Sequence, residues 1–284
     1  MNTVRRVSYA FLCIVPFLNF TVVVGMRALR VPGVYQAVGV AYFAVIAVAA
    51  WILSAGAIRA DAQNRKLFGL AGTLLPAPYA LMSLLWVGLG PPWEATVAEN
   101  EMRYLVLIFM TAAIVGGFAV LKEALSEAGE HSYASLGWAA IVLAGPLYIV
   151  WNTVEFGRFF GQEHAGAVPT AILSLRDTLD LLLSVGCILT YLATMAFAVS
   201  LGRVQWLGRW PTRVYVIISG VALLLLAFRG VPYPDAKSPP APWYTSVGFI
   251  AAIPAVPFIM PYLLGVVLLR RAGNLGMNQE EATR

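Results

Sequence analysis

The sequence predicts an all-α integral membrane protein, built as a single bundle of about eight transmembrane helices. Two observations lead to this fold class. Of the 284 residues, 60% are hydrophobic and 12% are charged, whereas a soluble domain carries about 25% charged residues. The few charges also stand mainly at the ends of long uncharged runs. Most of the chain therefore lacks a side meant for water.

Eight largely uncharged runs provide the roughly 20 residues that a helix needs to cross the hydrocarbon core of a bilayer. We expect spans at residues 7–26, 33–58, 67–90, 103–121, 133–155, 170–202, 211–229 and 244–269. No segment between them is long enough for a soluble domain. We therefore expect one membrane domain over residues 1–271 and a polar, disordered tail over 272–284.

The first run follows two arginines, as the core of a secretory signal would. It is longer than such a core, and no small-x-small cleavage site follows it, so we expect it to be kept as the first span. Between the fourth and fifth spans, the segment LKEALSEAGEHS predicts a helical extension that ends at Gly129. The segment 230–243 is proline-rich and predicts an extended strap.

The distribution of Lys and Arg predicts the orientation of the bundle. With the N-terminus inside, 12 of the 19 basic residues fall at inner span ends and seven at outer ones. Cytoplasmic loops carry the excess of Lys and Arg. We therefore expect both termini in the cytoplasm, with the chain in a bacterial inner (plasma) membrane and the lipid bilayer as its first partner.

Prolines interrupt several of the expected spans. They are Pro16, Pro76, Pro78, Pro146, Pro254, Pro257 and Pro261. Each removes a backbone donor, so the eighth span, with three prolines, is expected to be kinked or locally unwound. Broken helices line substrate sites in transporters. The alternative is that these prolines are merely tolerated, as membrane helices often tolerate them.

The sixth span carries a polar stripe at helical spacing. Its members are Arg176, Asp177, Asp180, Ser184, Cys187, Tyr191 and Thr194. Such a stripe is expected to face protein or water rather than lipid. Two alternatives remain open. The three charges can lie among lipid headgroups, because residues 181–202 alone can cross the bilayer, and the small residues can serve close helix packing.

A second polar face belongs to the fifth span and points to a shared pocket. Tyr148, Asn152 and Glu155 recur on it at helical spacing, Arg158 follows, and Arg229 ends the seventh span at a similar depth. We therefore predict an outward-facing polar pocket between spans five to eight. Its candidate ligand-binding residues are Asn152, Glu155, Arg158, Arg176, Asp177, Asp180, Tyr191 and Arg229.

Several chemistries are disfavoured. Both histidines lie in loops and every lysine lies outside the expected span cores, which argues against a bis-histidine haem and a retinal Schiff base. Cys13 and Cys187 lie inside spans, so neither a disulfide nor a cysteine metal site is predicted. The net charge of +5 forms no basic face for nucleic acid. We predict neither a cofactor nor a metal.

We therefore predict that the protein binds or transports a small or amphipathic molecule and is not an enzyme. One alternative is a structural or assembly subunit that packs against membrane-protein partners or further copies of itself. Another is an intramembrane enzyme acting on lipid headgroups, with Glu155, Asp177 or Asp180 as acid or base. The spacing of Asp177 and Asp180 also fits a shared metal, but the residues directly after Asp180, LLLSVGC, supply no further carboxylate.

Overall fold

The computed structural model describes residues 3–26, 34–59, 63–89, 95–166, 170, 174–229, 251 and 256–282. Among these residues all secondary structure is helical, which confirms the all-α part of the prediction. Five of the described helices are long and apolar enough to cross a membrane. They are α2 (Val34–Ile58), α5 (Val97–Glu127), α6 (Ser132–Ala165), α8 (Arg176–Arg203) and α9 (Arg209–Arg229). The other described helices are α1 (Thr3–Met26), α3 (Gln63–Leu74), α4 (Pro76–Leu89) and α11 (Val256–Ala282).

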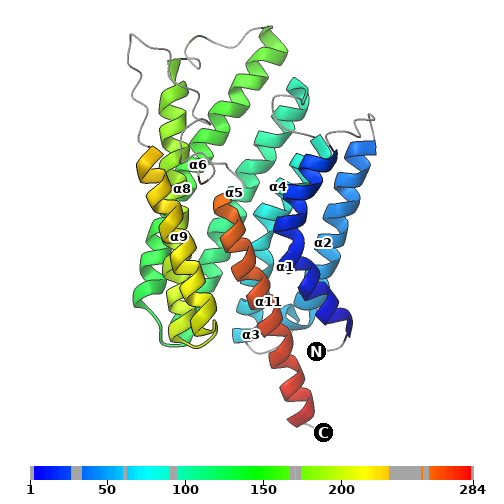
Figure 1. Cartoon of the computed structure of the whole chain (residues 1–284), viewed down its shortest axis with the longest axis vertical. Helices are drawn as coiled ribbons and strands as arrows, with labels where there is room; N and C mark the ends of the chain where they lie inside the picture. Colours follow the sequence, from blue (N-terminus) through cyan, green and yellow to red (C-terminus); the bar gives the residue numbers. More distant parts are fainter. Residues whose placement is uncertain are drawn as a thin grey trace.

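The helices stand side by side in one bundle, with both termini at the same end (Figure 1). The helices α6 and α8 form one side, and α1 and α2 form the other. Between them, α5 packs against α3, α4 and α6, and α11 packs against α1 to α4 and α8. The helix α9 lies at the edge and packs mainly on α8.

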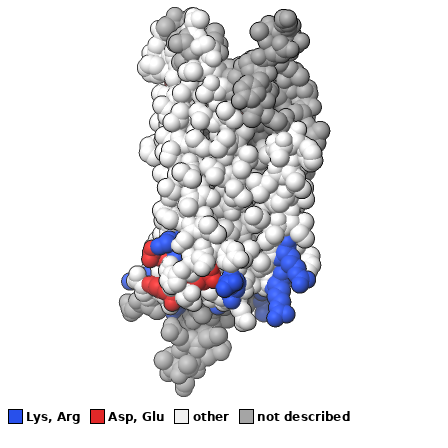
Figure 2. All heavy atoms as spheres, turned by 90° about the vertical axis from the view of Figure 1, so that its left-hand side faces the viewer, with Lys and Arg blue, Asp and Glu red and all other residues white. Residues whose placement is uncertain are grey.

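The surface of the bundle suits lipid rather than water. Large apolar side chains point outward, such as Phe228, which is 79% exposed, and Trp210, which is 75% exposed. On the face in Figure 2, charged side chains gather at the end where the termini lie, and the described surface above them is uncharged. A broad uncharged band next to a charged rim is typical of a helical bundle in a bilayer.

The predicted third span, 67–90, is not one helix. It is divided into α3 and α4 at Leu75, directly before Pro76. Pro76 lacks the N–H that would bond the preceding turn. The break is held by close packing, because a Cβ on Gly265 of α11 would collide with Cδ of Pro76, and one on Gly117 of α5 would lie 3.0 Å from Cδ2 of Leu75. Neither short helix alone reaches the roughly 20 residues of a full crossing.

The C-terminal ends of α5 and α11 test two further expectations. The extension of the fourth span is confirmed, because α5 runs to Glu127 and Gly129 then takes the left-handed conformation with φ 83°. The expectation of a disordered tail is wrong, since α11 continues to Ala282 and projects beyond the bundle (Figure 1). The strap 230–243 lies outside the described residues, as does most of the eighth span before Val256.

Tyrosines from other helices stabilise α1 where Pro16 interrupts its hydrogen bonding. Pro16 cannot donate to the carbonyl of Leu12, four residues earlier. The hydroxyl of Tyr262 in α11 donates to that carbonyl at 2.8 Å. The hydroxyl of Tyr79 in α4 donates to the carbonyl of Pro16 at 3.3 Å. The carbonyl of Leu12 therefore acquires its missing donor from α11, and α4 adds a further bond to the carbonyl of Pro16.

A third tyrosine completes this region from α2. The hydroxyl of Tyr42 donates to the amide oxygen of Asn19, one turn beyond Pro16. Asn19 is 7% exposed, so its amide would be costly to leave unbonded in an apolar interior. We call residues 12–19 of α1 the Pro16 turn. In this turn, three carbonyl or amide oxygens meet three tyrosine hydroxyls.

Candidate functional site

A small cavity of about 10 Å³ lies inside the bundle. Its walls come from α4, α5, α6, α8 and α11. The lining residues are Pro78, Met82, Leu107, Met110, Thr111, Tyr148, Trp151, Asn152, Leu183 and Phe258. We call it the Asn152 cavity. It differs from the predicted pocket in its walls, because α9 packs mainly on α8 and supplies none of the lining.

Asn152 is the polar group that makes this cavity unusual. The residue is 3% exposed, and its Oδ1 atom is buried with no hydrogen-bond partner among the described residues. A buried acceptor left unpaired costs about 1–3 kcal/mol. Such an atom calls for an explanation, and a ligand that donates a hydrogen bond is one.

Two hydroxyls share the lining with Asn152. The hydroxyl of Thr111 donates to the carbonyl of Leu107 at 3.0 Å, within its own helix. The hydroxyl of Tyr148 is 2.9 Å from that of Thr190 in α8, and Tyr148 is 2% exposed. Sequence reasoning placed Tyr148 on the same face as Asn152. It missed Thr111, because a lone threonine in an apolar helix gives no periodic signal.

Aromatic rings and an ion pair lie further along α6. Nη2 of Arg158 is 2.7 Å from Oε2 of Glu155, and these side chains are 37% and 14% exposed. The guanidinium of Arg158 also lies 4.4 Å from the ring centre of Phe159. The ring of Tyr104 in α5 stacks on Phe159 at 5.6 Å and meets Trp151 edge-on at 5.6 Å. Trp151 belongs to both groups, so the ion pair lies next to the cavity.

One charged residue near this end was not among the candidates. Arg103 of α5 is 3% exposed and acts electrostatically on Tyr104, as Glu155 and Arg158 also do. A fully buried arginine at this depth is expensive and usually has a function or a structural partner. In the sequence, Arg103 stands at the start of an apolar run. That position fits an arginine among lipid headgroups as well as a buried one.

The other candidates are placed as follows. Tyr191 is 2% exposed, and its hydroxyl donates to the carbonyl of Ala251 at 3.2 Å, so it does not line the cavity. Asp180 is half-buried near the start of α8. The side chains of Arg176, Asp177 and Arg229 lie outside the described part. Asn152 thus lines the cavity and Glu155 pairs with Arg158 further along α6. A role in ligand binding stays a prediction for the whole set.

The deep half of the stripe on the sixth span faces protein. Cys187 and Thr194 are both 0% exposed. The helices approach closely here, because a Cβ on Gly186 would lie 3.1 Å from the ring of Tyr148. The expectation that this stripe avoids lipid is confirmed for these residues. Small residues at such a contact also fit the packing alternative.

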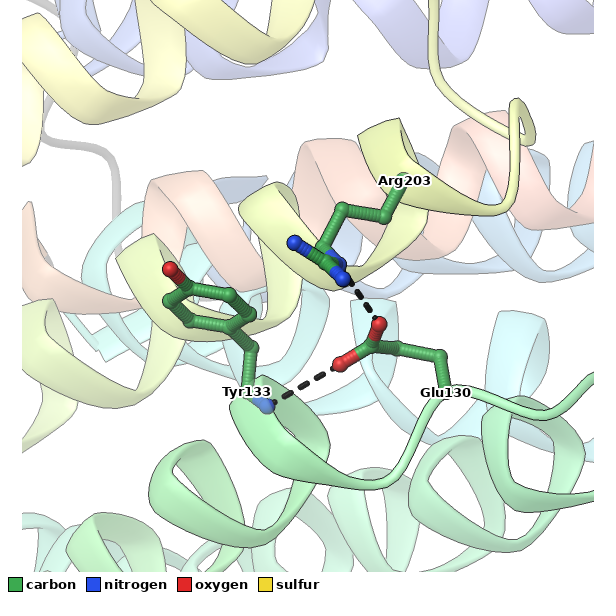
Figure 3. Close-up of polar contacts among 3 residues, drawn as sticks. All are labelled: Glu130, Tyr133 and Arg203. Atoms are coloured by element: carbon green, nitrogen blue, oxygen red, sulfur yellow. Dashed lines mark hydrogen bonds and ion pairs between the residues drawn. The ribbon is translucent and has the colours of Figure 1, made fainter.

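A larger hollow of about 540 Å³ lies at the opposite end of the α6–α8 pair. Oε2 of Glu130 accepts a bond of 2.8 Å from Nε of Arg203, and Oε1 accepts one of 3.0 Å from the backbone N–H of Tyr133 (Figure 3). The carboxylate thus caps the start of α6 and holds the end of α8. Beside it, burial lowers the pKa of Arg271, whose guanidinium lies 5.4 Å from the ring centre of Trp206.

Within the described ranges, no group of three or more His, Cys, Asp or Glu residues is arranged to hold a metal ion. The site is therefore characterised by its amide, its hydroxyls and its aromatic rings. No protein-family model, curated protein or solved structure matches this chain.

Proposed function

We propose that the protein is a membrane protein of eight crossings that binds or transports a small or amphipathic molecule through the Asn152 cavity and the polar end of α6 above it. The observation that carries this proposal is the unpaired, buried Oδ1 atom of Asn152. Its cost is relieved if a ligand supplies the donor.

The surroundings of the cavity support a binding role. The lining is largely apolar, with a few polar atoms at defined places, which is the usual composition of a ligand site. At about 10 Å³ it is far smaller than an ordinary ligand pocket of some 300–1,000 Å³. The bound molecule therefore enters by displacing side chains. Met82 and Met110 suit such a change because methionine side chains are flexible.

The Glu155–Arg158 pair is proposed to form the entrance. Its two side chains are partly exposed, while Asn152 one turn away is buried. A molecule approaching along α6 would therefore pass from a charged rim to an uncharged interior.

Native mass spectrometry of the protein extracted from its own membrane tests the proposal. We expect a bound small molecule or lipid on the wild type and its loss from Asn152→Leu. Ser219→Ala is the matched control, because Ser219 of α9 is 0% exposed, its hydroxyl is also buried without a partner among the described residues, and it is not among the lining residues of the cavity. The same bound species on all three proteins, or none on any, would contradict the proposal. Stoichiometric protein partners without a ligand would support an assembly subunit.

The proposed orientation, with both termini cytoplasmic, is tested by cysteine labelling in intact cells. Glu127 at the end of α5 and Gln162 near the end of α6 are both exposed, and they lie toward opposite ends of the bundle. A membrane-impermeant maleimide should label Gln162→Cys and leave Glu127→Cys unlabelled until the cells are opened. The reverse pattern would invert the topology.

A further inference from the structure

We infer that the Asn152 cavity binds the uncharged hydroxyl group of an amphipathic molecule, a neutral alcohol whose apolar chain lies between the helices. This inference rests on the proposed function and names the class of its ligand. It follows from the positions of the hydroxyl hydrogens around the cavity, from the absence of charge in its lining and from its size.

The donor in the hydrogen bond between the hydroxyls of Tyr148 and Thr190 follows from the second contact that Thr190 makes. The hydroxyl of Thr190 has one hydrogen, and the carbonyl of Gly186 lies 2.8 Å away and can only accept. That hydrogen is therefore used within α8. The 2.9 Å bond between the two hydroxyls is then donated by Tyr148, whose own hydrogen is used as well.

The other oxygens that line the cavity have no hydrogen left to donate. Thr111 has donated its hydrogen to the carbonyl of Leu107, and Oδ1 of Asn152 has none. The oxygens of Asn152, Thr111 and Tyr148 therefore present lone pairs alone. The amide nitrogen of Asn152 is a donor at the same place. A hydroxyl group both donates and accepts, so it can meet an acceptor and this donor together. A ketone, an ether or an ester can only accept, and it leaves the three acceptors unpaired.

The lack of charge in the lining also restricts the ligand. None of the ten lining residues carries a formal charge at neutral pH. The nearby Glu155 is already paired with Arg158 at 2.7 Å. Bringing an ammonium into this lining would cost several kcal/mol for desolvation without a counter-charge. A hydroxyl meets the acceptors at a much lower desolvation cost.

The volume of the cavity limits the polar group that it can hold. A volume of about 10 Å³ corresponds to about one water-sized group. One hydroxyl therefore fits the cavity as it stands, and the apolar chain is accommodated by displacing side chains of the apolar lining. Met82, Met110 and Leu183 belong to that lining. The binding energy then comes from one polar head and a buried chain.

The test is a native mass spectrometry titration of the purified protein with probes of similar chain length. The probes are 1-decanol, methyl nonyl ether, 2-decanone and decylammonium. We expect 1-decanol to bind the wild type at least tenfold more tightly than the ether or the ketone. Asn152→Leu should bind alcohol and ether alike, while Ser219→Ala should keep the wild-type preference.

Each other outcome has a defined meaning. Tighter binding of 2-decanone would show that Asn152 presents its N–H group, and tighter binding of decylammonium would show a cation site; either would overturn the inference but keep the proposed function. Equal binding of alcohol and ether by the wild type would also overturn it. If none of the probes binds, the inference is overturned, and the proposed function is then decided by the species bound to the protein extracted from its own membrane.

Discussion

The Pro16 turn and the Asn152 cavity are both polar regions inside an apolar bundle, but their hydrogen bonding differs. At the Pro16 turn, the acceptors of Leu12, Pro16 and Asn19 meet three tyrosine hydroxyls. At the cavity, the hydroxyl hydrogens are used elsewhere and Oδ1 of Asn152 has no donor among the described residues. The first region is balanced and stabilises the fold. The second leaves an acceptor open and is suited to binding.

Removing one tyrosine hydroxyl should leave an unpaired acceptor at the Pro16 turn, as at the cavity. Of the changes considered, this one should have the largest effect. Tyr262→Phe leaves the carbonyl of Leu12 without a donor, because Pro16 cannot supply one. We expect the free energy of unfolding to fall by about 1–2 kcal/mol, toward the upper end for a hydrogen bond between membrane helices. Reversible unfolding in mixed micelles measures it.

Tyr133→Phe is the control for that experiment, because Tyr133 is 38% exposed and surface changes of this kind usually stay within about 0.5 kcal/mol. Equal effects of the two variants would show that the Tyr262 bond contributes nothing specific.

Replacing Asn152 should instead remove the unpaired acceptor from the cavity. Asn152→Leu replaces an unpaired buried amide by an apolar side chain of similar size. We expect the free energy of unfolding to rise by about 0.5–1.5 kcal/mol, while ligand binding is lost. The same unfolding assay checks the first part. A loss of stability would mean that Asn152 is already satisfied within the protein.

The far end of the α6–α8 pair offers a milder test of a balanced site. Glu130→Gln weakens both the cap on α6 and the pair with Arg203, whose side chain is 60% exposed. We expect a loss of about 0.5–1 kcal/mol, because the arginine is largely in solvent, which limits what the pair contributes. In Glu123→Gln, which alters a pair with a 62% exposed carboxylate, thermal unfolding should barely change. A larger loss there than at Glu130 would contradict the capping role.

The smallest effect concerns the preference for a donor. Thr190→Val removes the acceptor that holds the hydrogen of Tyr148, so the tyrosine hydroxyl becomes free to donate into the cavity. We expect the preference for 1-decanol over the ether to fall about threefold, a change well under 1.4 kcal/mol. The titration described above measures it. An unchanged preference would show that Tyr148 does not face the ligand.

The sequence predicted those features that depend on local spacing. The fold class followed from where charges interrupt apolar runs, and the face of α6 followed from the helical recurrence of Tyr148, Asn152 and Glu155. It could not predict which helices meet that face, since spatial order is not local. Arg229 was grouped with the pocket from its depth alone, and because its side chain lies outside the described residues, that grouping stays a prediction.

Proline shows the same limit. The interruption at Pro76 was expected, but its division of one span into two helices depends on how closely Gly265 of α11 approaches. Pro16 likewise predicts an unbonded carbonyl at Leu12. It does not predict that Tyr262 supplies the donor, because that contact is set by tertiary packing.

The bond between Tyr262 and Leu12 joins residues that are 250 positions apart. At a synthesis rate of about 5–20 residues per second, α11 emerges roughly 10–50 s after α1. During that interval the carbonyl of Leu12 lacks its final donor, and the nascent first helix has to rely on water, lipid headgroups or the insertion machinery. Final docking of α1 against α11 thus awaits the end of translation.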